Sequence, residues 1–203
     1  MRILLDDTPC DLKAKTVGEA IDAAAEVARR LGRLIVEVTV DDTLWAEGKL
    51  SSPKQLEASA EVVRLTSAEP RQLVDEAFTD AAEALADADE LQQEAARLIQ
   101  SDQYTVSMDK LNEALSIWLS VQEAIVKGSR IVGIDLDDVV VGERSINASI
   151  SRLNEWLLVI RNALTDSDQI ALADTLLYEL PEVVGEWRSI LEHLQHLARE
   201  GGR

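Results

Sequence analysis

Apolar residues in the first third of the chain follow several short patterns, which predict a small unit of strands and one helix. Val36, Val38 and Val40 alternate with polar residues, as expected of a strand with one solvent-facing side. The other strand candidates are residues 3–5, 44–45 and 62–65. Apolar residues at spacings of three and four over residues 17–31 predict a helix between the first two strands. The order β-α-β-(β)-β predicts a small α+β domain over residues 1–67.

Signals for helix ends and turns support this division. Thr16 and Glu19 have the spacing of a capping box, in which the hydroxyl accepts from a free amide of the first turn and the carboxylate reaches back. Gly32 lies where a left-handed residue would end the helix. The segment carrying Gly48 and Pro53 is expected to be a loop before the last strand.

From about Pro70 onward the spacing becomes helical and stays so. Ser67 is predicted to cap the first long helix, and Pro70 suits a first helical turn. The apolar face of this helix repeats like a heptad and is rich in alanine, which lets a neighbouring helix approach closely. Its predicted positions are Val74, Ala77, Ala81, Ala84, Ala88, Leu91, Ala95 and Leu98.

Three further helices complete a predicted bundle over residues 68–203. The second runs over residues 105–127, the third over 146–164, and the fourth begins after caps at residues 165–167. Glycines at 128, 133 and 142 mark the connection between the second and third helices. The buried side of the fourth helix is expected to include Ile170, with a kink at Pro181. The whole chain is therefore predicted as α+β, with an acidic, mainly antiparallel four-helix bundle whose first and last helices are the longest.

Charge narrows the partners that the chain can bind. The formal net charge is −18, and residues 70–203 hold 25 acidic against 11 basic residues. Such a surface repels phosphate groups, so neither nucleic acid nor an anionic membrane is an expected partner. Cys10 is the single cysteine, no apolar run is long enough to span a bilayer, and the first residues do not form a signal peptide. A soluble, cytoplasmic protein is the expectation.

One short segment carries an acidic motif. Asp135, Asp137 and Asp138 follow the apolar residues 132–134, and this segment resembles the first motif of the haloacid-dehalogenase-like phosphatases. The resemblance implies Asp135 as nucleophile, Asp137 as acid and base, and a bound Mg²⁺. It covers about nine residues, and the residues after Val139 show helical periodicity and no lysine, whereas that family needs a doubly wound sheet and a later lysine. An acidic loop between two helices is the favoured interpretation.

Other candidate residues predict no catalytic, cofactor-binding or metal site. The two histidines, His193 and His196, are spaced three apart, but no Glu-x-x-His pair accompanies them and solvated side chains are expected. Cys10 has no neighbour in the sequence that would activate it, although a histidine could approach it in space. Trp156 lies one residue from the apolar face of its helix, so it is an interaction candidate together with the three aspartates of residues 135–138.

The pattern therefore favours a non-enzymatic protein-interaction or scaffold protein. Unequal helix lengths leave apolar surface unpaired, which predicts self-association into a homo-oligomer. An adaptor or chaperone that presents a helical groove to a protein client is the alternative. A Mg²⁺-dependent phosphatase acting through Asp135 is a more distant one.

Overall fold

The computed structural model describes residues 1–200 and is α+β, with a mixed five-stranded sheet and mostly helices elsewhere. The chain divides into two compact units, Met1–Leu73 and Val74–Arg203. Within the described residues, no helix is both long enough and apolar enough to cross a membrane.

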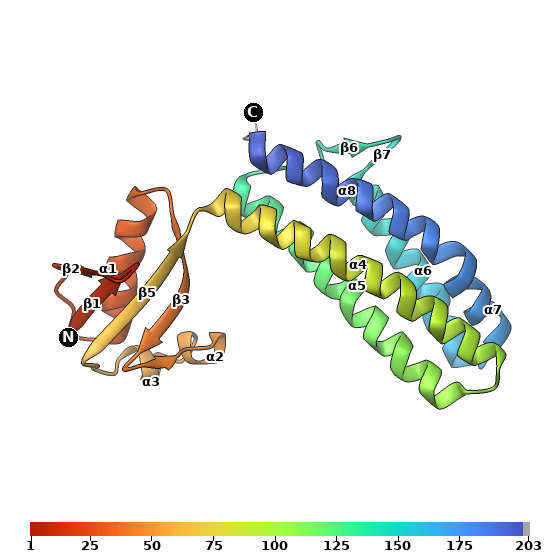
Figure 1. Ribbon diagram of the computed structural model, residues 1–203, viewed down its shortest axis with the longest axis horizontal. Helices are drawn as coiled ribbons and strands as arrows, with labels where there is room; N and C mark the ends of the chain where they lie inside the picture. Colours follow the sequence, from red (N-terminus) through yellow and green to blue (C-terminus); the bar gives the residue numbers. More distant parts are fainter. Residues whose placement is uncertain (201–203) are drawn as a thin grey trace. The chain divides into compact units, whose positions relative to one another are not determined.

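The first unit is built on the five-stranded sheet. Its strands are β1 (Arg2–Leu5), β2 (Thr8–Cys10), β3 (Leu34–Val40), β4 (Thr43–Leu44) and β5 (Val62–Ala68). Their order is β2-β1-β5-β3-β4, with β1 and β5 parallel and the other neighbours antiparallel (Figure 1). The sequence pattern missed β2, which returns from β1 through Asp6 and Asp7, both at positive φ.

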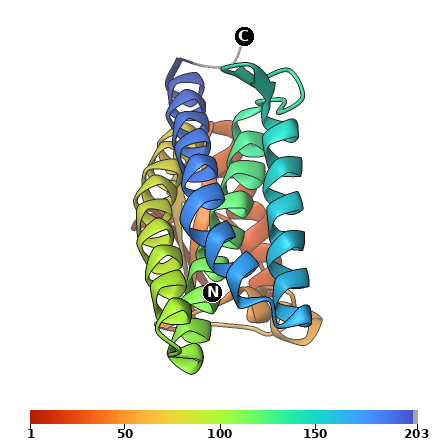
Figure 2. The ribbon, with the colours of Figure 1, turned by 90° about the vertical axis from the view of Figure 1, so that its right-hand side faces the viewer.

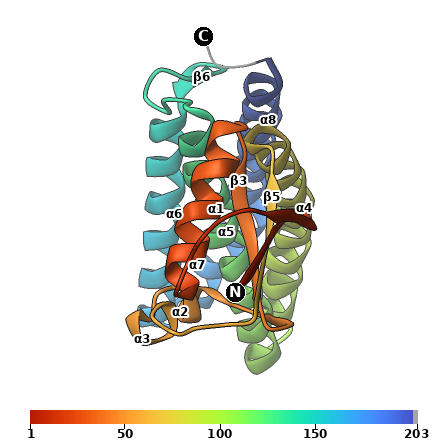
Figure 3. The same cartoon turned by 90° about the vertical axis from the view of Figure 1, so that its left-hand side faces the viewer.

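Helix α1 (Val17–Arg30) covers one face of this sheet (Figure 3). Its buried positions are mostly alanines, which pack against Ile3, Val38 and Leu65 of the strands. Thr16 accepts a hydrogen bond from the Glu19 amide at 3.2 Å, which confirms the predicted cap. Gly32 has a φ of 71° and follows the end of the helix, as predicted.

The predicted loop after β4 contains two single-turn helices instead. These are α2 (Glu47–Leu50) and α3 (Pro53–Leu56). Helix α3 lies close to the start of α1: a Cβ at Gly18 would stand 3.2 Å from the Leu56 carbonyl oxygen. Glycine at this position therefore permits the close approach of the two helices.

Ser67 does not cap the long helix, which corrects the prediction. It lies in β5, where its amide and hydroxyl donate to the Asp6 carboxylate, each at 2.7 Å. The Arg33 Nε donates to the Ser67 hydroxyl at 2.6 Å. Hydrogen bonds from the Ser67 side chain and then from its backbone lower the pKa of Asp6 from its ordinary value. Burial opposes them to a smaller extent, and the Arg33 charge adds the smallest lowering effect.

The second unit consists mainly of long helices. They are α4 (Pro70–Gln100), α5 (Tyr104–Val132), α6 (Ile146–Asp166), the short α7 (Gln169–Asp174) and α8 (Leu180–Glu200). Figure 2 shows α4, α5, α6 and α8 running alongside one another. Their buried side chains form a common core, in which Trp118 of α5 and Trp187 of α8 meet edge to face with ring centroids 5.4 Å apart. Gln92 of α4 is fully buried and accepts a hydrogen bond from the Trp118 indole at 3.3 Å.

Four of the eight residues predicted for the buried face of α4 are wrong, and in each case the next residue along the chain is the buried one. Phe78, Leu85, Gln92 and Ile99 are buried, whereas Ala77, Ala84, Leu91 and Leu98 are half-buried. The buried positions include the polar Gln92, so their apolar pattern is interrupted in the sequence. The predicted positions are all apolar, and their pattern is continuous. A buried glutamine that has found a partner cannot be recognised from spacing alone.

Helix α5 is longer than predicted because Gly128 lies inside it. A Cβ at this position would stand 2.8 Å from Phe78 Cε1, so glycine lets α5 approach α4. The helix ends at Gly133, whose φ is 75°. Helices α4 and α5 have 31 and 29 residues, so α4 is longer than α5, as predicted, but by only two residues.

The connections around α6 also differ from the prediction. A small hairpin of β6 (Val140–Val141) and β7 (Arg144–Ser145) precedes α6, where only a loop was expected. Asp168, which follows the predicted capping residues, caps α7 by accepting from the Ala171 amide at 2.9 Å.

A π-helical segment, η1 (Thr175–Glu179), joins α7 to α8 just before Pro181. Its wider turn shifts the buried face, so Leu172 and Leu176 are buried while Ile170 is 77% exposed, against the prediction.

Candidate functional site

An apolar cleft of about 560 Å³ lies in the first unit, beside strand β3. Helix α1 forms one wall through Gly18, Ile21 and Asp22. The segment after β4 contributes Trp45, and Leu50 and Leu56 of the two short helices also line the cleft. The close approach of α3 to Gly18 thus helps to shape this cleft.

The other wall of the cleft is the edge of β3. Four consecutive residues of this strand, 35–38, line it. Because successive side chains of a strand point to opposite faces of the sheet, such a run places the cleft along the strand's edge. Strand β4 pairs with only Thr39 and Val40, and the Trp45 amide donates to the Val38 carbonyl at 2.9 Å. Residues 34–37 therefore have no neighbouring strand on that side in the described sheet.

A β-bulge at Val36 interrupts the regular alternation of β3 at this open edge. Ile35 pairs with Ser67 and Glu37 with Thr66, which leaves Val36 as an extra residue. Val36 is 45% exposed, whereas Val38 and Val40 are buried. The sequence prediction that all three valines share one face is therefore wrong at Val36.

Two acidic side chains line the same cleft. Asp22 of α1 and Glu37 of β3 are both exposed, and neither has an ion pair or side-chain hydrogen bond among the described residues. Among the residues that the structure describes, no basic side chain lines the cleft. Leu44, another lining residue, is 60% exposed. The cleft thus combines an open strand edge, exposed apolar side chains and two carboxylates that form no ion pair with the described residues.

The sequence-predicted aspartates lie elsewhere, in the loop that follows α5. Asp135 accepts from the Asp137 amide at 3.0 Å, and Asp137 accepts from the side chain of Asn147. Both carboxylates line a shallow depression of about 480 Å³ with Arg130. Asp138 is not among its lining residues. No group of three or more His, Cys, Asp or Glu residues within the described chain has the geometry of a metal site.

The structural context of the phosphatase-like motif differs from the one that the resemblance implies. Val132 is the last residue of helix α5, and Gly133 ends that helix, so Asp135 does not follow a strand. Ile134, Leu136 and Val139 pack against the core of the helical unit. The described residues of this segment match the expected acidic loop, with a hairpin added after it.

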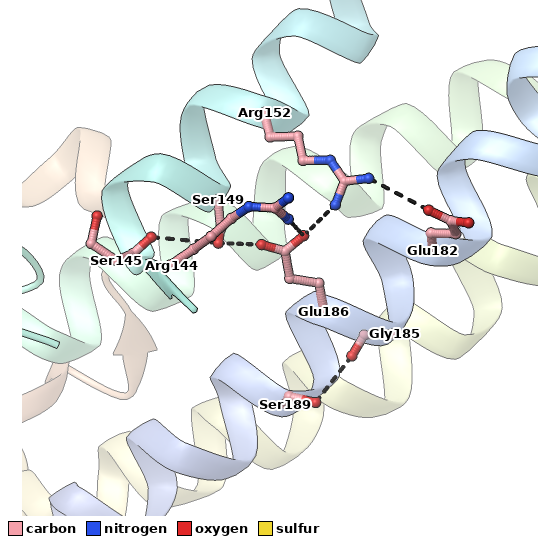
Figure 4. Close-up of polar contacts among 8 residues, drawn as sticks. All are labelled: Arg144, Ser145, Ser149, Arg152, Glu182, Gly185, Glu186 and Ser189. Atoms are coloured by element: carbon pink, nitrogen blue, oxygen red, sulfur yellow. Dashed lines mark hydrogen bonds and ion pairs between the residues drawn. The ribbon is translucent and has the colours of Figure 1, made fainter. Parts of the chain in front are cut away.

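A second polar cluster joins α6 to α8 and was not foreseen. Figure 4 shows Glu186 of α8 surrounded by Arg144, Ser149 and Arg152. Arg152 Nη1 donates to Glu186 Oε2 at 2.8 Å, Arg144 Nη1 approaches the same oxygen at 3.5 Å, and the Ser149 hydroxyl donates to Oε1. The Glu186 side chain is only 18% exposed. Two patterns in the sequence could have revealed this cluster. On the later helix, Glu182 and Glu186 are spaced four apart, and at the start of the earlier one Ser145, Ser149 and Arg152 are spaced four and three apart.

The remaining candidates are not among the residues that line the cleft. Trp156 is half-buried and packs against both core clusters of the helical unit. His196 lies 3.4 Å from Glu200 on an exposed face of α8, and His193 is half-buried. The Cys10 thiol donates to the Thr8 carbonyl at 3.6 Å. The structure brings together Asp135 and Asp137, and it does not bring Trp156 to them.

Comparisons with protein-family models, with curated proteins and with solved structures found no match to this chain.

Proposed function

We infer that this chain is a non-enzymatic protein-interaction or scaffold protein whose first unit binds a segment of a partner protein. The observation that carries the proposal is the cleft beside β3, where an open strand edge borders exposed apolar side chains. Proteins usually protect such edges with charge, proline or a covering segment. An edge left open beside an apolar cleft is the arrangement that peptide-binding proteins use.

Selection from a displayed library of nine-residue peptides against the full chain tests this function. Enriched peptides are expected to lose binding to the Leu44→Lys variant, because that substitution places a charge in the cleft. Leu31→Lys is the matched control, since Leu31 is 67% exposed and does not line the cleft. Failure to enrich any peptide, or equal loss of binding in both variants, would contradict the proposal.

The helical unit would then serve self-association. Several large apolar side chains on it are exposed, among them Leu119, Leu158 and Ile170. Their burial between two copies would remove apolar surface from water. We also propose that the helical unit is a mainly antiparallel four-helix bundle, formed by α4, α5, α6 and α8. Light scattering is expected to give more than the monomer mass at micromolar concentration, and a monomer at high micromolar concentration would contradict self-association.

An adaptor or chaperone is the second candidate, and one observation favours it. A shallow groove of about 290 Å³ lies between α4 and α5, lined by Ala77, Ala84 and Ala124 together with Asp80. Helix α4 carries eight acidic and two basic residues. An amphipathic helix with basic residues is the client that this groove would fit. Its capture should weaken as salt is raised, because the charge attraction is screened.

A further inference from the structure

We propose that the occupant of the cleft is an extended apolar segment that pairs with β3 as an added strand and carries a lysine or arginine. The proposal rests on the protein-interaction function and specifies the chemistry of the partner. It depends on three features of the first unit: the outer edge of residues 34–37, where the described sheet has no further strand, the apolar lining, and the carboxylates of Asp22 and Glu37.

The open edge determines the backbone conformation of the partner. Strand β3 pairs with β5 along its length on one side, but β4 covers only its last two residues on the other. Amide and carbonyl groups on an edge without a neighbour can pair with a further strand. An added segment would lie beside residues 34–37 and would stop where the Trp45 amide meets the Val38 carbonyl.

The cleft lining determines the side chains on one face of that segment. Ile21 of α1, Val36 of β3 and Leu44 of β4 leave apolar surface open to water. Alternate side chains of an added strand would point into the cleft. β-branched apolar residues suit these positions, because they favour extended backbone and bury apolar area.

The negative charge of the cleft determines which residues flank the apolar part of the bound segment. Asp22 and Glu37 lie on opposite walls of the cleft and have no cationic neighbour on the lining. A lysine or arginine at either end of the bound segment would supply one. A second copy of β3 fits less well, because its residues 34–37 include Glu37 and no cationic side chain that could pair with the carboxylates of the cleft.

Synthetic octapeptides test this chemistry with the full chain. The first has four consecutive valine and isoleucine residues flanked by lysines, the second has the same core flanked by glutamates, and the third is the lysine peptide N-methylated on alternate core amides. Fluorescence anisotropy is expected to show that the lysine peptide binds roughly tenfold more tightly than the glutamate peptide. The double variant Asp22→Asn, Glu37→Gln should remove most of this preference. N-methylation should weaken binding at least roughly tenfold, because it removes backbone donors.

The outcomes separate this inference from the function on which it rests. Cleft-dependent binding that is insensitive to N-methylation would overturn strand addition, while leaving the protein-interaction function in place. Equal binding of the lysine and glutamate peptides would overturn the charge preference. If the lysine peptide binds only to residues outside the first unit, hydrogen exchange would show no protection in residues 34–37. That result would overturn the inference.

Discussion

At the scale of single residues, hydrogen-bonding side chains decide details that spacing does not reveal. Asp6, Arg33 and Ser67 come from three separate parts of the first unit and meet at one end of the sheet. Because hydrogen bonds from Ser67 lower the pKa of Asp6, its charged form stabilises the folded unit.

The Asp6 cluster predicts a specific acid sensitivity. The folded-state pKa of Asp6 lies below its ordinary value of 3.8, so this contribution to stability is present above that value and is lost as pH falls through the folded pKa. Asp6→Asn, which tolerates the observed positive φ, should lower the free energy of unfolding at pH 7 and reduce its dependence on pH below about 4. Urea titrations at pH 7 and pH 3 measure both. An unchanged pH dependence would contradict this account of Asp6.

Glu186 predicts unequal effects for its two arginine partners. Arg152 is 27% exposed and donates at 2.8 Å, whereas Arg144 is 52% exposed and lies at 3.5 Å. Arg152→Ala should therefore reduce the free energy of unfolding by about 1–3 kcal/mol, because it leaves a half-buried carboxylate with poorer pairing. Arg144→Ala, the matched control, should cost less than about 1 kcal/mol. Denaturant unfolding of the two variants decides the order, and the reverse order would be inconsistent with the cluster described.

At the scale of elements, the sequence pattern predicted the main helices and most strands but not their registers. Thr16 and Gly32 were confirmed because their roles depend only on neighbouring residues. Gly128 was misinterpreted as a helix end, since its actual role depends on Phe78, fifty residues earlier in the chain. The cleft was missed for a similar reason: the bulge at Val36 and the short β4 become visible only once β3 and β5 are paired.

Two glycines inside helices should respond oppositely to alanine. Gly128→Ala places a Cβ 2.8 Å from the Phe78 ring, so overpacking should cost about 1–3 kcal/mol. Gly185 in α8 has open space around the same position, so Gly185→Ala should stabilise by up to about 1 kcal/mol through helix propensity. Thermal unfolding compares the two variants. Stabilisation by Gly128→Ala would contradict the close packing of α4 and α5.

At the scale of the whole molecule, the balance of charge should govern the response to salt. The net charge of −18 means that acidic side chains repel one another in the folded state, and this repulsion weakens as ionic strength rises. The Tm at pH 7 is therefore expected to rise between 10 mM and 300 mM NaCl. A falling Tm would mean that attractive ion pairs outweigh the repulsion.

A single substitution tests whether the whole chain has the phosphatase activity that the motif around Asp135 implies. The structural context around Asp135 provides no strand before the motif, so no hydrolysis of a generic phosphate ester with Mg²⁺ is expected. Hydrolysis that disappears in Asp135→Asn would favour the phosphatase instead. Hydrolysis that persists in that variant would exclude Asp135 as the nucleophile.

Hydrogen–deuterium exchange of the full chain, with and without the lysine-flanked peptide, tests most directly whether the β3 edge binds a partner strand. Exchange is expected to slow in residues 34–37, with smaller changes around Leu44 and Trp45 and no change in the long helices. Protection confined to residues 74–200, or none at any concentration up to millimolar, would contradict the assignment of the β3 edge as the binding site.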